Sequence, residues 1–580
     1  MDASGSVVAQ ATRPITTFQY EEDSRLYEQS AAQIWDAIAG CVREAVSAAH
    51  VEPEDVQGIG FDATCSLVVT ARDGSPVSVT PPSLADRAGR QRTSERNVIL
   101  WADHRAEEEA AQINSTGHKV LHYVGGTMSL EMETPKTLWL KRHLTPAEFD
   151  RAQFFDLPDY LTYRATDSTA RSNCSLVCKY GYIPPGVDGS ELGWQPDFLR
   201  QIGLGSVVGE DESFTPLGGV PGRNGLVLSA GMPVGAGLSE RAAGELGLLP
   251  HTPVASALID AYAGWVGTVA ARDANNTASQ SSLHDARTRL VAIAGTSTCY
   301  NVQSEEGIRV DGVWGPYKNT VFPGFWMNEG GQSSTGQLID YVLETHPAFP
   351  ALQAEARESN TSVFALLERT LHELMHAQNI PETSSSSYVY LVRHMSLYPD
   401  LYGNRSPLAD TTLRGIISGL SLDRSRSDLA RRYVLTLEAI SLQTRHIVEE
   451  MNAKGHVINA IYLSGGGQAR NRIFAQLLAD TCGMRVQMPT EASASVVLGS
   501  ALLGRLASEV TQAETGAPRA PAPVLPGQAD VDRVGMQFEN RLWHIMEEST
   551  RPGVSVRPTQ DGGRIHALLN AKYKVRMIGV

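Results

Sequence analysis

Short β-rich runs alternate with longer helical patterns along most of the chain, and this alternation constrains the fold more than any other feature. It is typical of an α/β protein. The predicted strands are Val56–Phe61, Leu67–Thr70, Thr252–Ala257, Leu290–Ala294, Ala460–Leu463 and Arg485–Met488. The predicted helices are Ala31–Ala48, Ser239–Glu245, Ser334–Leu343, Arg431–Met451, Arg470–Asp480 and Ala492–Leu506. Several strands lead through a glycine-bearing turn into a helix, so ligands are expected at the carboxyl ends of the strands.

The length of 580 residues exceeds what one hydrophobic core can bury, so two or more domains are expected. A polar stretch from Asp273 to Arg287 separates one set of predicted elements from the next. We therefore predict a first domain over residues 1–275 and a second over residues 286–508. Residues 509–580 contain a Pro/Ala-rich linker, Thr515 to Ala529, and a C-terminal segment.

The composition is that of an ordinary soluble globular protein, with 42% hydrophobic and 19% charged residues. The formal charge of −15 argues against nucleic acid or an anionic membrane as a partner, because both select basic surfaces. No stretch approaches the roughly 20 apolar residues of a membrane span, and no apolar core of a signal peptide is present. A cytoplasmic protein is expected.

Cysteine usage fits the same compartment. The six cysteines are Cys41, Cys65, Cys174, Cys178, Cys299 and Cys482. They are too few for a disulfide scaffold in a chain of this length, so reduced thiols are expected. Cys174 and Cys178 lack a second pair of Cys or His at zinc-site spacing, which disfavours a metal site there.

Four polar or reactive residues interrupt one apolar run, "GIGFDATCSLVV" at residues 58–69. They are Asp62, Thr64, Cys65 and Ser66. One interpretation is that they face a ligand at the end of a strand. The other is a strand-to-strand turn whose polar groups satisfy one another.

Two glycine-bearing turns indicate a phosphate or nucleotide ligand. In "LVAIAGTSTCYNV", Gly295, Thr296 and Ser297 join two β-runs and can present N–H and O–H donors to phosphate oxygens, although an ordinary hairpin turn has the same residues. In "AIYLSGGGQARN", a strand ends in three glycines and a helix begins near Arg470, so the backbone can approach an anionic ligand closely. Together the two turns favour nucleotide binding.

Asp260 in "VASALIDAYAGWVG" follows a predicted strand and precedes small residues. A carboxylate at the carboxyl end of a strand is well placed to take a proton from a substrate hydroxyl. It can equally cap the helix that begins at Ala261.

"HELMH", His372 to His376, spells the zinc-protease pattern of two imidazoles and a glutamate on one helix. The surrounding helix is amphipathic, with Phe364, Leu367, Leu371 and Leu374 on the predicted buried stripe. No third ligand follows at a suitable spacing, so a metalloprotease is disfavoured.

Seven segments in order resemble the FGGY family of carbohydrate kinases. They are "WADHRAEEEA", "TPKTLWLKRH", "DLPDYLTYRAT", "IDAYAGWVG", "AGTSTCYN", "FPGFWMNEGGQSSTGQLIDY" and "LSGGGQARN". The resemblance implies two ribonuclease-H-like domains of the actin-like ATPase fold, with an active-site cleft between a sugar-binding and a nucleotide-binding domain. "TCSLV", Thr64 to Val68, is similar to the segment that marks the D-ribulokinase branch.

The same resemblance assigns roles to individual residues. Asp260 matches the catalytic base, which deprotonates a terminal sugar hydroxyl as it attacks the γ-phosphate of MgATP. The positions implied to bind ATP are Gly295, Thr296, Ser297, Gly336, Gly466, Gly467 and Asn471. The positions implied to contact the sugar are Cys65, Trp101, Asp103, Lys179 and Glu329. Their structural alternatives are a core residue for Trp101, a solvated cation for Lys179 and a helix N-terminal charge for Glu329.

One departure from the family pattern stands at the N-terminus. Family members open with a strand and hairpin carrying Asp-x-Gly-Thr, which contacts the metal and γ-phosphate. This chain starts at "MDASGSVVAQATRPI", where the next strand is expected. We expect either that the sequence begins at a downstream methionine or that the product is a weakened or inactive kinase, and the intact remaining motifs favour the first.

The resemblance implies ATP-dependent phosphorylation of D-ribulose to D-ribulose 5-phosphate, with ATP and Mg²⁺ as cofactors and a possible homodimer. Two alternatives stay open. One is a kinase for another pentulose or pentitol, such as L-ribulose, xylulose or ribitol. The other is a non-catalytic sugar-binding homologue.

Overall fold

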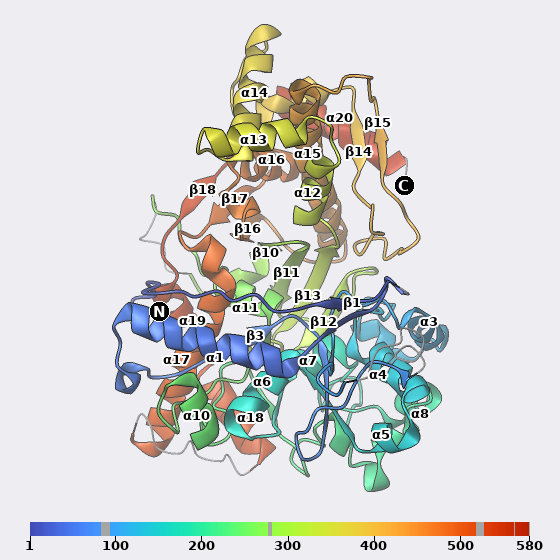
Figure 1. The fold of residues 1–580 in the computed structure, drawn as a ribbon, viewed down its shortest axis with the longest axis vertical. Helices are drawn as coiled ribbons and strands as arrows, with labels where there is room; N and C mark the ends of the chain where they lie inside the picture. Colours follow the sequence, from blue (N-terminus) through green and yellow to red (C-terminus); the bar gives the residue numbers. More distant parts are fainter. Residues whose placement is uncertain (22, 83–92, 276–280, 518–526, 562, 579–580) are drawn as a thin grey trace.

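The computed structural model describes residues 1–580 except 22, 83–92, 276–280, 518–526, 562 and 579–580, and the chain forms two lobes (Figure 1). The upper lobe in Figure 1 contains helices α12 to α16 and α20 around a large sheet. The lower lobe contains the N-terminal helices and also α17 to α19, which come from the C-terminal part of the sequence. The predicted α/β class is confirmed.

A seven-stranded sheet organises the upper lobe, in the order β12-β13-β11-β10-β16-β17-β18. Its strands are β10 Arg289–Ala294, β11 Thr298–Ser304, β12 Trp314–Lys318, β13 Trp326–Gln332, β16 Ala460–Gly465, β17 Arg485–Met488 and β18 Val554–Val556. Strands β10, β16 and β17 run parallel, whereas β10 and β11 form an antiparallel hairpin. The predicted hairpin and the three strands predicted in this region are therefore confirmed.

Helices cover this sheet and bury its apolar side chains. They are α12 Gly336–Glu344, α13 Phe349–Glu358, α14 Val363–Ala377, α15 Arg426–Ala453, α16 Arg472–Cys482 and α20 Arg564–Ile578. Strand residues such as Leu463 pack in one core with Val434 of α15 and Leu478 of α16. A short antiparallel pair, β14 Ser396–Tyr398 and β15 Ile416–Ser418, stands apart from the main sheet.

The lower lobe holds a five-stranded sheet in the order β1-β2-β5-β4-β6. Its strands are β1 Phe18–Gln19, β2 Tyr27–Gln29, β4 Leu67–Ala71, β5 Val98–Ile99 and β6 Ala152–Asp156. The helices of this lobe are α1 Ala31–Ala49, α3 Glu107–Ser115, α4 Glu133–His143, α5 Pro146–Asp150, α6 Leu157–Thr166, α7 Asn173–Lys179, α8 Pro196–Gln201, α9 Gly205–Val208, α10 Glu240–Leu246 and α11 Asp260–Val266. A further parallel pair joins β7 Arg171–Ser172 to β8 Val227–Leu228. The predicted strand Leu67–Thr70 and the first two predicted helices are confirmed.

Two predicted strands differ from the structure. The runs predicted at 56–61 and 252–257 lie side by side but share only a single bridge, Ile59 to Val254. The regular strands come next along the chain, where β3 Asp62–Ala63 pairs in parallel with β9 Leu258–Ile259. Glycines weaken a strand and permit close approach, and a Cβ on Gly60 would lie 1.8 Å from the Ser500 carbonyl oxygen. Within the described part of the chain, β3 pairs with β9 alone.

The C-terminal part of the sequence returns to both lobes. α17 Ser495–Thr515, α18 Gln528–Gln537 and α19 Glu539–Ser549 lie in the lower lobe (Figure 1). α20 returns to the upper lobe, where Lys572 donates to the Glu438 carboxylate of α15 at 2.8 Å. Most of the predicted linker, residues 518–526, lies outside the described residues.

The "HELMH" helix is amphipathic, as predicted, but one of its predicted core positions is wrong. Leu366, Leu367, Leu371 and Met375 form the buried face of α14. Phe364 is 47% exposed, because the neighbouring helices leave a cavity beside it instead of packing over it. The described residues contain no group of three His, Cys, Asp or Glu side chains that could hold a metal ion.

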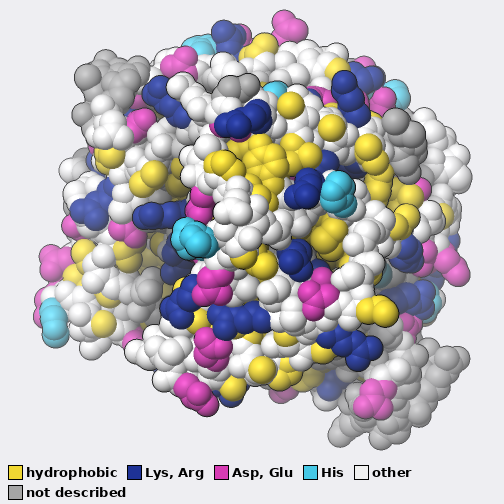
Figure 2. All heavy atoms as spheres, turned by 90° about the horizontal axis from the view of Figure 1, so that it is seen from above, with side chains coloured by type: hydrophobic (Ala, Val, Ile, Leu, Met, Phe, Trp, Pro, Cys, Tyr) yellow, Lys and Arg dark blue, Asp and Glu magenta, His cyan; other side chains and the backbone are white. Residues whose placement is uncertain are grey.

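Further observations concern the surface and the thiols. Among the described helices, none has both the length and the apolar character needed to cross a bilayer. Basic and acidic side chains are interspersed over the face seen in Figure 2. All six cysteines are free thiols.

Glycines let helix α17 cross α11 at backbone contact distance. A Cβ on Gly499 of α17 would lie 1.9 Å from the Ala263 carbonyl oxygen of α11. A Cβ on Gly267, just after α11, would lie 2.0 Å from the Ser495 carbonyl oxygen. This crossing ties the C-terminal part of the sequence to the helix that begins at Asp260.

We expect Gly499→Ala to destabilise the protein by about 1–3 kcal/mol, because the added methyl group forces the two helix backbones apart. The matched control is Gly244→Ala in α10, where an added Cβ meets no atom within 4 Å. That control should be neutral or stabilising by about 0.5–1 kcal/mol. Thermal and denaturant unfolding measure both, and equal stability of the two variants would contradict the close crossing.

Candidate functional site

Asp260 lies at the junction of β9 and α11, half-buried. Its Oδ1 accepts a hydrogen bond from the Ala261 backbone N–H at 2.7 Å, so the side chain is held close to the helix start. Burial, together with the neighbouring Asp62 carboxylate, raises the pKa of Asp260 to about 7. The predicted base is therefore close to half protonated near neutral pH, where it can exchange a proton readily.

Asp62 is a neighbour of Asp260, and the sequence named it only among four polar residues that face either a ligand or one another. It begins β3, which pairs in parallel with β9, and it lies opposite Leu258, two residues before Asp260. The Ser500 hydroxyl of α17 donates to its Oδ2. Burial raises the pKa of Asp62 also. The available signal was one acid on each of two β-rich runs, Asp62 and Asp260.

Lys179 and Glu329 form a buried pair between the two lobes. Lys179 ends α7, and its Nζ lies 3.9 Å from Glu329 Oε2 on β13. The Tyr262 hydroxyl donates to the same oxygen at 3.0 Å, and Lys179 Nζ lies 4.5 Å from the centre of the Trp314 ring. Lys179 is thus no solvated cation, and Glu329 lies on a strand and not at a helix N-terminus.

Cys65 and Trp101 lie on the lower-lobe side of the same region. Burial raises the pKa of the Cys65 thiol, and the positive charge of Lys179 acts in the opposite direction. Trp101 is half-buried, and its backbone N–H donates to Ser66 Oγ at 3.2 Å. The structure therefore brings Cys65 close to Lys179 and, through Ser66, to Trp101.

Asp103 has a different environment. It has no exposed surface, and its Oδ2 accepts from the Tyr27 N–H at 2.7 Å. Arg105 donates to both of its oxygens, at 2.9 and 2.7 Å, and also to Glu28. Its described hydrogen bonds and ion pairs all lie within this buried network, which joins β2 to the loop after β5.

A cavity of about 970 Å³ opens beside the predicted phosphate turn in the upper lobe. Of the predicted ATP contacts, Gly295, Thr296, Gly336, Gly467 and Asn471 line it. The lining residues that sequence reasoning missed include Phe364, Glu368, Tyr433, Gln468 and Arg470. Phe364 and Glu368 come from α14, about 70 residues after the phosphate turn, and no local pattern links the two segments.

The turn of residues 295–297 packs directly onto the start of α12. The Gly336 N–H donates to the Gly295 carbonyl at 3.2 Å, and a Cβ on Gly336 would lie 2.5 Å from that oxygen. Gln468 Nε2 donates to the same carbonyl at 3.0 Å and so connects the two glycine-bearing turns. Ser297 closes the turn by accepting from the Gly295 N–H at 2.8 Å.

The second glycine-bearing turn leaves open space over its backbone. A Cβ on Gly466 or Gly467 would meet no atom within 4 Å. Asn471 caps α16, with its Oδ1 accepting from the Phe474 N–H at 3.1 Å and its Nδ2 donating to the Tyr433 hydroxyl at 2.7 Å. This edge of the cavity can therefore admit a flat ligand against the backbone.

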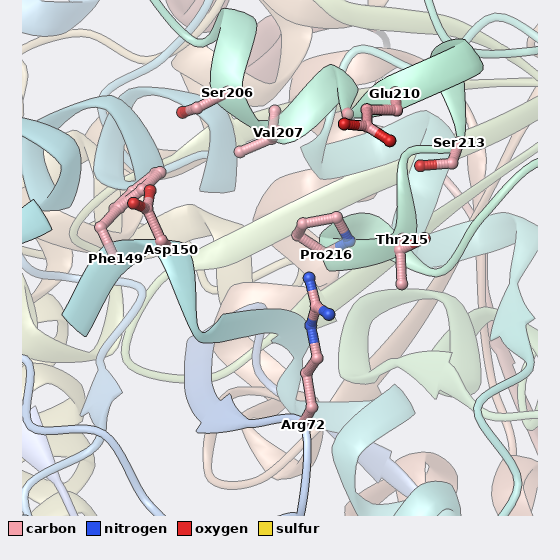
Figure 3. Close-up of a pocket in the computed structure, with 10 residues that line it drawn as sticks. Arg72, Phe149, Asp150, Ser206, Val207, Glu210, Ser213, Thr215 and Pro216 are labelled. Carbon is pink, nitrogen blue, oxygen red and sulfur yellow. The ribbon is translucent and has the colours of Figure 1, made fainter. Parts of the chain in front are cut away.

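A smaller cavity of about 410 Å³ lies in the lower lobe (Figure 3). Arg72 points into it toward Pro216, and Asp150 and Glu210 stand on its rim. None of the predicted site residues lines it. The larger cavity is therefore the candidate nucleotide site.

Comparisons with known proteins agree with this arrangement. The family model for the C-terminal domain of the FGGY family of carbohydrate kinases matches residues 290–508. A D-ribulokinase of Saccharomyces cerevisiae is 45% identical over 516 residues, covering 88% of this chain and 70% of that protein. A human protein described as FGGY carbohydrate kinase domain-containing protein is 42% identical over 509 residues, covering 88% of this chain and 86% of its own.

Solved structures show the same fold at low sequence identity. A xylulose kinase of Rhodospirillum rubrum has a TM-score of 0.65 at 19% identity, covering 98% of this chain and 94% of that one. A Plasmodium falciparum glycerol kinase with ADP has a TM-score of 0.63 at 14% identity, and the match covers 97% of this chain and 92% of the glycerol kinase. The identity to the yeast and human relatives, together with this fold, shows that the chain belongs to the FGGY family of carbohydrate kinases.

Proposed function

We propose that this kinase transfers the γ-phosphate of ATP to the O5 hydroxyl of D-ribulose. The observation that carries the proposal is the position of Asp260. Its carboxylate is half-buried beside Asp62, and the charges of Glu329 and Lys179 also act on its pKa. The name of the yeast relative, D-ribulokinase, supports the choice of sugar. Another pentulose or pentitol as substrate, or sugar binding without catalysis, are the competing functions.

In the proposed reaction Asp260 accepts the proton of the O5 hydroxyl. The O5 oxygen forms the new bond to the γ-phosphorus as the bond to the bridging oxygen of ADP breaks. Such a transfer depends mainly on alignment and charge stabilisation. Helix α11 couples the two halves of the site, because a Cβ on its Gly264 would lie 2.9 Å from Ile293 Cγ1 of β10, the strand that leads into the phosphate turn.

The cavity beside the phosphate turn is the proposed ATP site. Gly295 and Thr296 would lie against the phosphates, and the open backbone at Gly466 and Gly467 would lie against the adenosine. The sugar would lie against Lys179 and Glu329. Asp103 accepts hydrogen bonds from Arg105 and from the Tyr27 N–H, and it would stabilise the loop that borders the sugar site.

Asp62 fits a Mg²⁺ ion that accompanies ATP. It offers hard oxygen donors, and its burial beside a second acid raises its pKa, a cost that a cation would remove. Magnesium is usually held by one or two carboxylates together with substrate phosphates. When bound, the ion would neutralise negative charge on the transferring phosphoryl group.

Asp260→Asn should lower kcat on D-ribulose by about 10²–10⁴-fold, because the variant cannot accept the hydroxyl proton. The affinity for the sugar should stay within a few-fold, because the amide has the size and shape of the carboxylate. A coupled ADP-release assay and sugar titration measure the two quantities. The matched control is Asp55→Asn, an exposed residue of the lower lobe, which should behave like the unmodified protein. Near-normal turnover in Asp260→Asn would end this assignment.

The rate should depend on pH through Asp260. Because its pKa is raised to about 7, the carboxyl is protonated and inactive as a base at lower pH, so kcat/KM should rise as pH increases through about 7. Replacing Asp62 with Asn removes a nearby negative charge and should move the midpoint of this rise to lower pH, at a lower overall rate because the variant also loses the proposed Mg²⁺ ligand. The pH profile of kcat/KM measures both. A profile that is flat across neutral pH would contradict the role of Asp260.

Ala365→Trp should raise the KM for ATP about tenfold or more, because the exposed Ala365 lines the large cavity and the indole would fill the space of the nucleotide. The KM for the sugar should change little. Ala377→Trp, an exposed position at the far end of the same helix, is the matched control. Equal KM values for ATP in both variants would place the nucleotide elsewhere.

A further inference from the structure

A segment of the upper lobe crosses to the lower lobe beside the proposed sugar site. It consists of residues 399–415 between β14 and β15, and Figure 1 shows it descending toward the lower lobe. Arg405 Nη2 donates to both oxygens of Glu131 at 3.1 and 3.0 Å. The ring of Tyr402 lies 5.1 Å from that of His104. Glu131 and His104 both belong to the lower lobe.

Arg405 is buried where a sugar could meet it. Its side chain is 8% exposed, and its guanidinium lies 5.2 Å from the centre of the Trp314 ring and 5.8 Å from that of Trp101. Space for it exists because β13 has a glycine at position 331, where a Cβ would lie 2.4 Å from Arg405 Cδ. Arg405 therefore packs against β13 two residues after Glu329.

One donor of this buried guanidinium has no partner. Among the described residues, nothing accepts a hydrogen bond from Arg405 Nε, although the Nη2 group is fully used by Glu131. A buried donor without a partner is unfavourable, and functional sites are where such groups are usually kept. A bound ligand with an accepting oxygen would satisfy it.

Cys299 connects Arg405 to the predicted base. Its half-buried thiol lies on β11, and the charges of Glu329, Arg405, Asp260 and Lys179 all act on it. The geometry agrees, because Arg405 packs over Gly331, which pairs with Cys299 across β11 and β13. Asp260 and Arg405 thus both lie near this thiol. If Asp260 takes the proton of O5, we expect Arg405 to meet an oxygen farther along the sugar.

We propose that Arg405 positions the sugar from the upper lobe, donating through Nε to an oxygen at the carbonyl end of the ketopentose while Nη2 holds Glu131. The inference rests on the proposed function for the identity of the sugar. A guanidinium only donates and a carbonyl oxygen only accepts, so the two match fully, whereas the hydroxyl of a pentitol can accept from Arg405 but needs a further acceptor for its own O–H. Arg405 would thus discriminate a ketopentose from the corresponding pentitol and would couple sugar binding to contact between the lobes.

Hydrogen bonds to the upper lobe fix the segment of residues 399–415 on either side of Arg405. Asn404 Nδ2 donates to Asp400 Oδ1 at 3.0 Å, and Gln443 of α15 donates to the same oxygen at 3.2 Å. The Ser406 hydroxyl donates to the Gly312 carbonyl at 2.8 Å. Because the residues on either side of Arg405 are fixed before a sugar binds, little conformational entropy would be lost on binding.

Arg405→Lys keeps the charge and can still pair with Glu131, but it lacks the Nε donor and the planar group between the two indoles. We expect the Kd for D-ribulose, measured by calorimetry without ATP, to rise about tenfold, as loss of one hydrogen bond to a charged donor predicts. The KM for ATP should stay within about twofold. Ribitol binding should change less than D-ribulose binding. Arg405→Gln should show the same loss if the lysine variant does not fold.

Two controls separate this role from a purely structural one. Arg414→Lys, an exposed arginine of the same segment, should leave sugar binding unchanged. Glu131→Gln removes the Arg405–Glu131 ion pair but keeps Nε, so it should weaken D-ribulose binding less than Arg405→Lys does. Unchanged D-ribulose affinity in Arg405→Lys, or an equal loss for Glu131→Gln, would overturn the inference.

The test also distinguishes the inference from the proposed function. If the unmodified protein binds and phosphorylates a different pentulose, the choice of D-ribulose fails and the Arg405 comparison is made on that sugar. A tenfold loss there supports the role of Arg405 independently. If the unmodified protein binds no pentulose, both proposals are overturned.

Discussion

Two half-buried acids on neighbouring parallel strands are the constraint on which the site depends. Placing Asp62 and Asp260 together in a partly buried region is unfavourable, because burial raises the pKa of both and the Asp62 charge further raises that of Asp260. The fold compensates with a hydroxyl from Ser500 and a backbone N–H from Ala261. The result is a carboxyl that titrates near neutral pH at the start of α11, a property that a proton-accepting group needs.

The position of this pair depends in turn on glycines. Helix α17 reaches Asp62 only because it lies against the backbone of Gly60 and of α11, where any side chain would collide. The same helix comes from the far end of the sequence, after the seven-stranded sheet of the upper lobe. The acid pair, the cavity proposed for the nucleotide and the Lys179–Glu329 pair are therefore held in one arrangement by contacts between segments that are distant in the sequence.

The sequence predicted those parts of the fold and site that are encoded locally. The hairpin around Gly295 and the strand-to-helix turn at Gly465 follow from glycines between β-runs, and the long helices follow from their periodicity. Phe364 was misplaced because periodicity reports which face of a helix is apolar and cannot tell whether a neighbour covers it. The strand around Gly60 began later than predicted for a similar tertiary reason, the close approach of α17.

Features of the site that join distant parts of the sequence could not be predicted without the structure. Arg405 and Glu131 are 274 residues apart, and no local sequence pattern links them. The position of Asp62 near Asp260 became visible only from the pairing of β3 with β9. The roles of Lys179 and Glu329 came from family resemblance, and the structure supplies their pairing. For Asp103 the family resemblance and the structure differ. The resemblance assigns this residue to the sugar, whereas in the structure its carboxylate accepts hydrogen bonds from Arg105.

The central claim is that one site joins ATP to a ketopentose, and substrate-dependent ADP release tests it most directly. The purified protein would be given MgATP with D-ribulose, L-ribulose, xylulose and ribitol in turn, and sugar binding would be measured in parallel. The account predicts the highest kcat/KM on D-ribulose, with a phosphorylated product at O5. Sugar binding without ADP release on any member of the panel would contradict it.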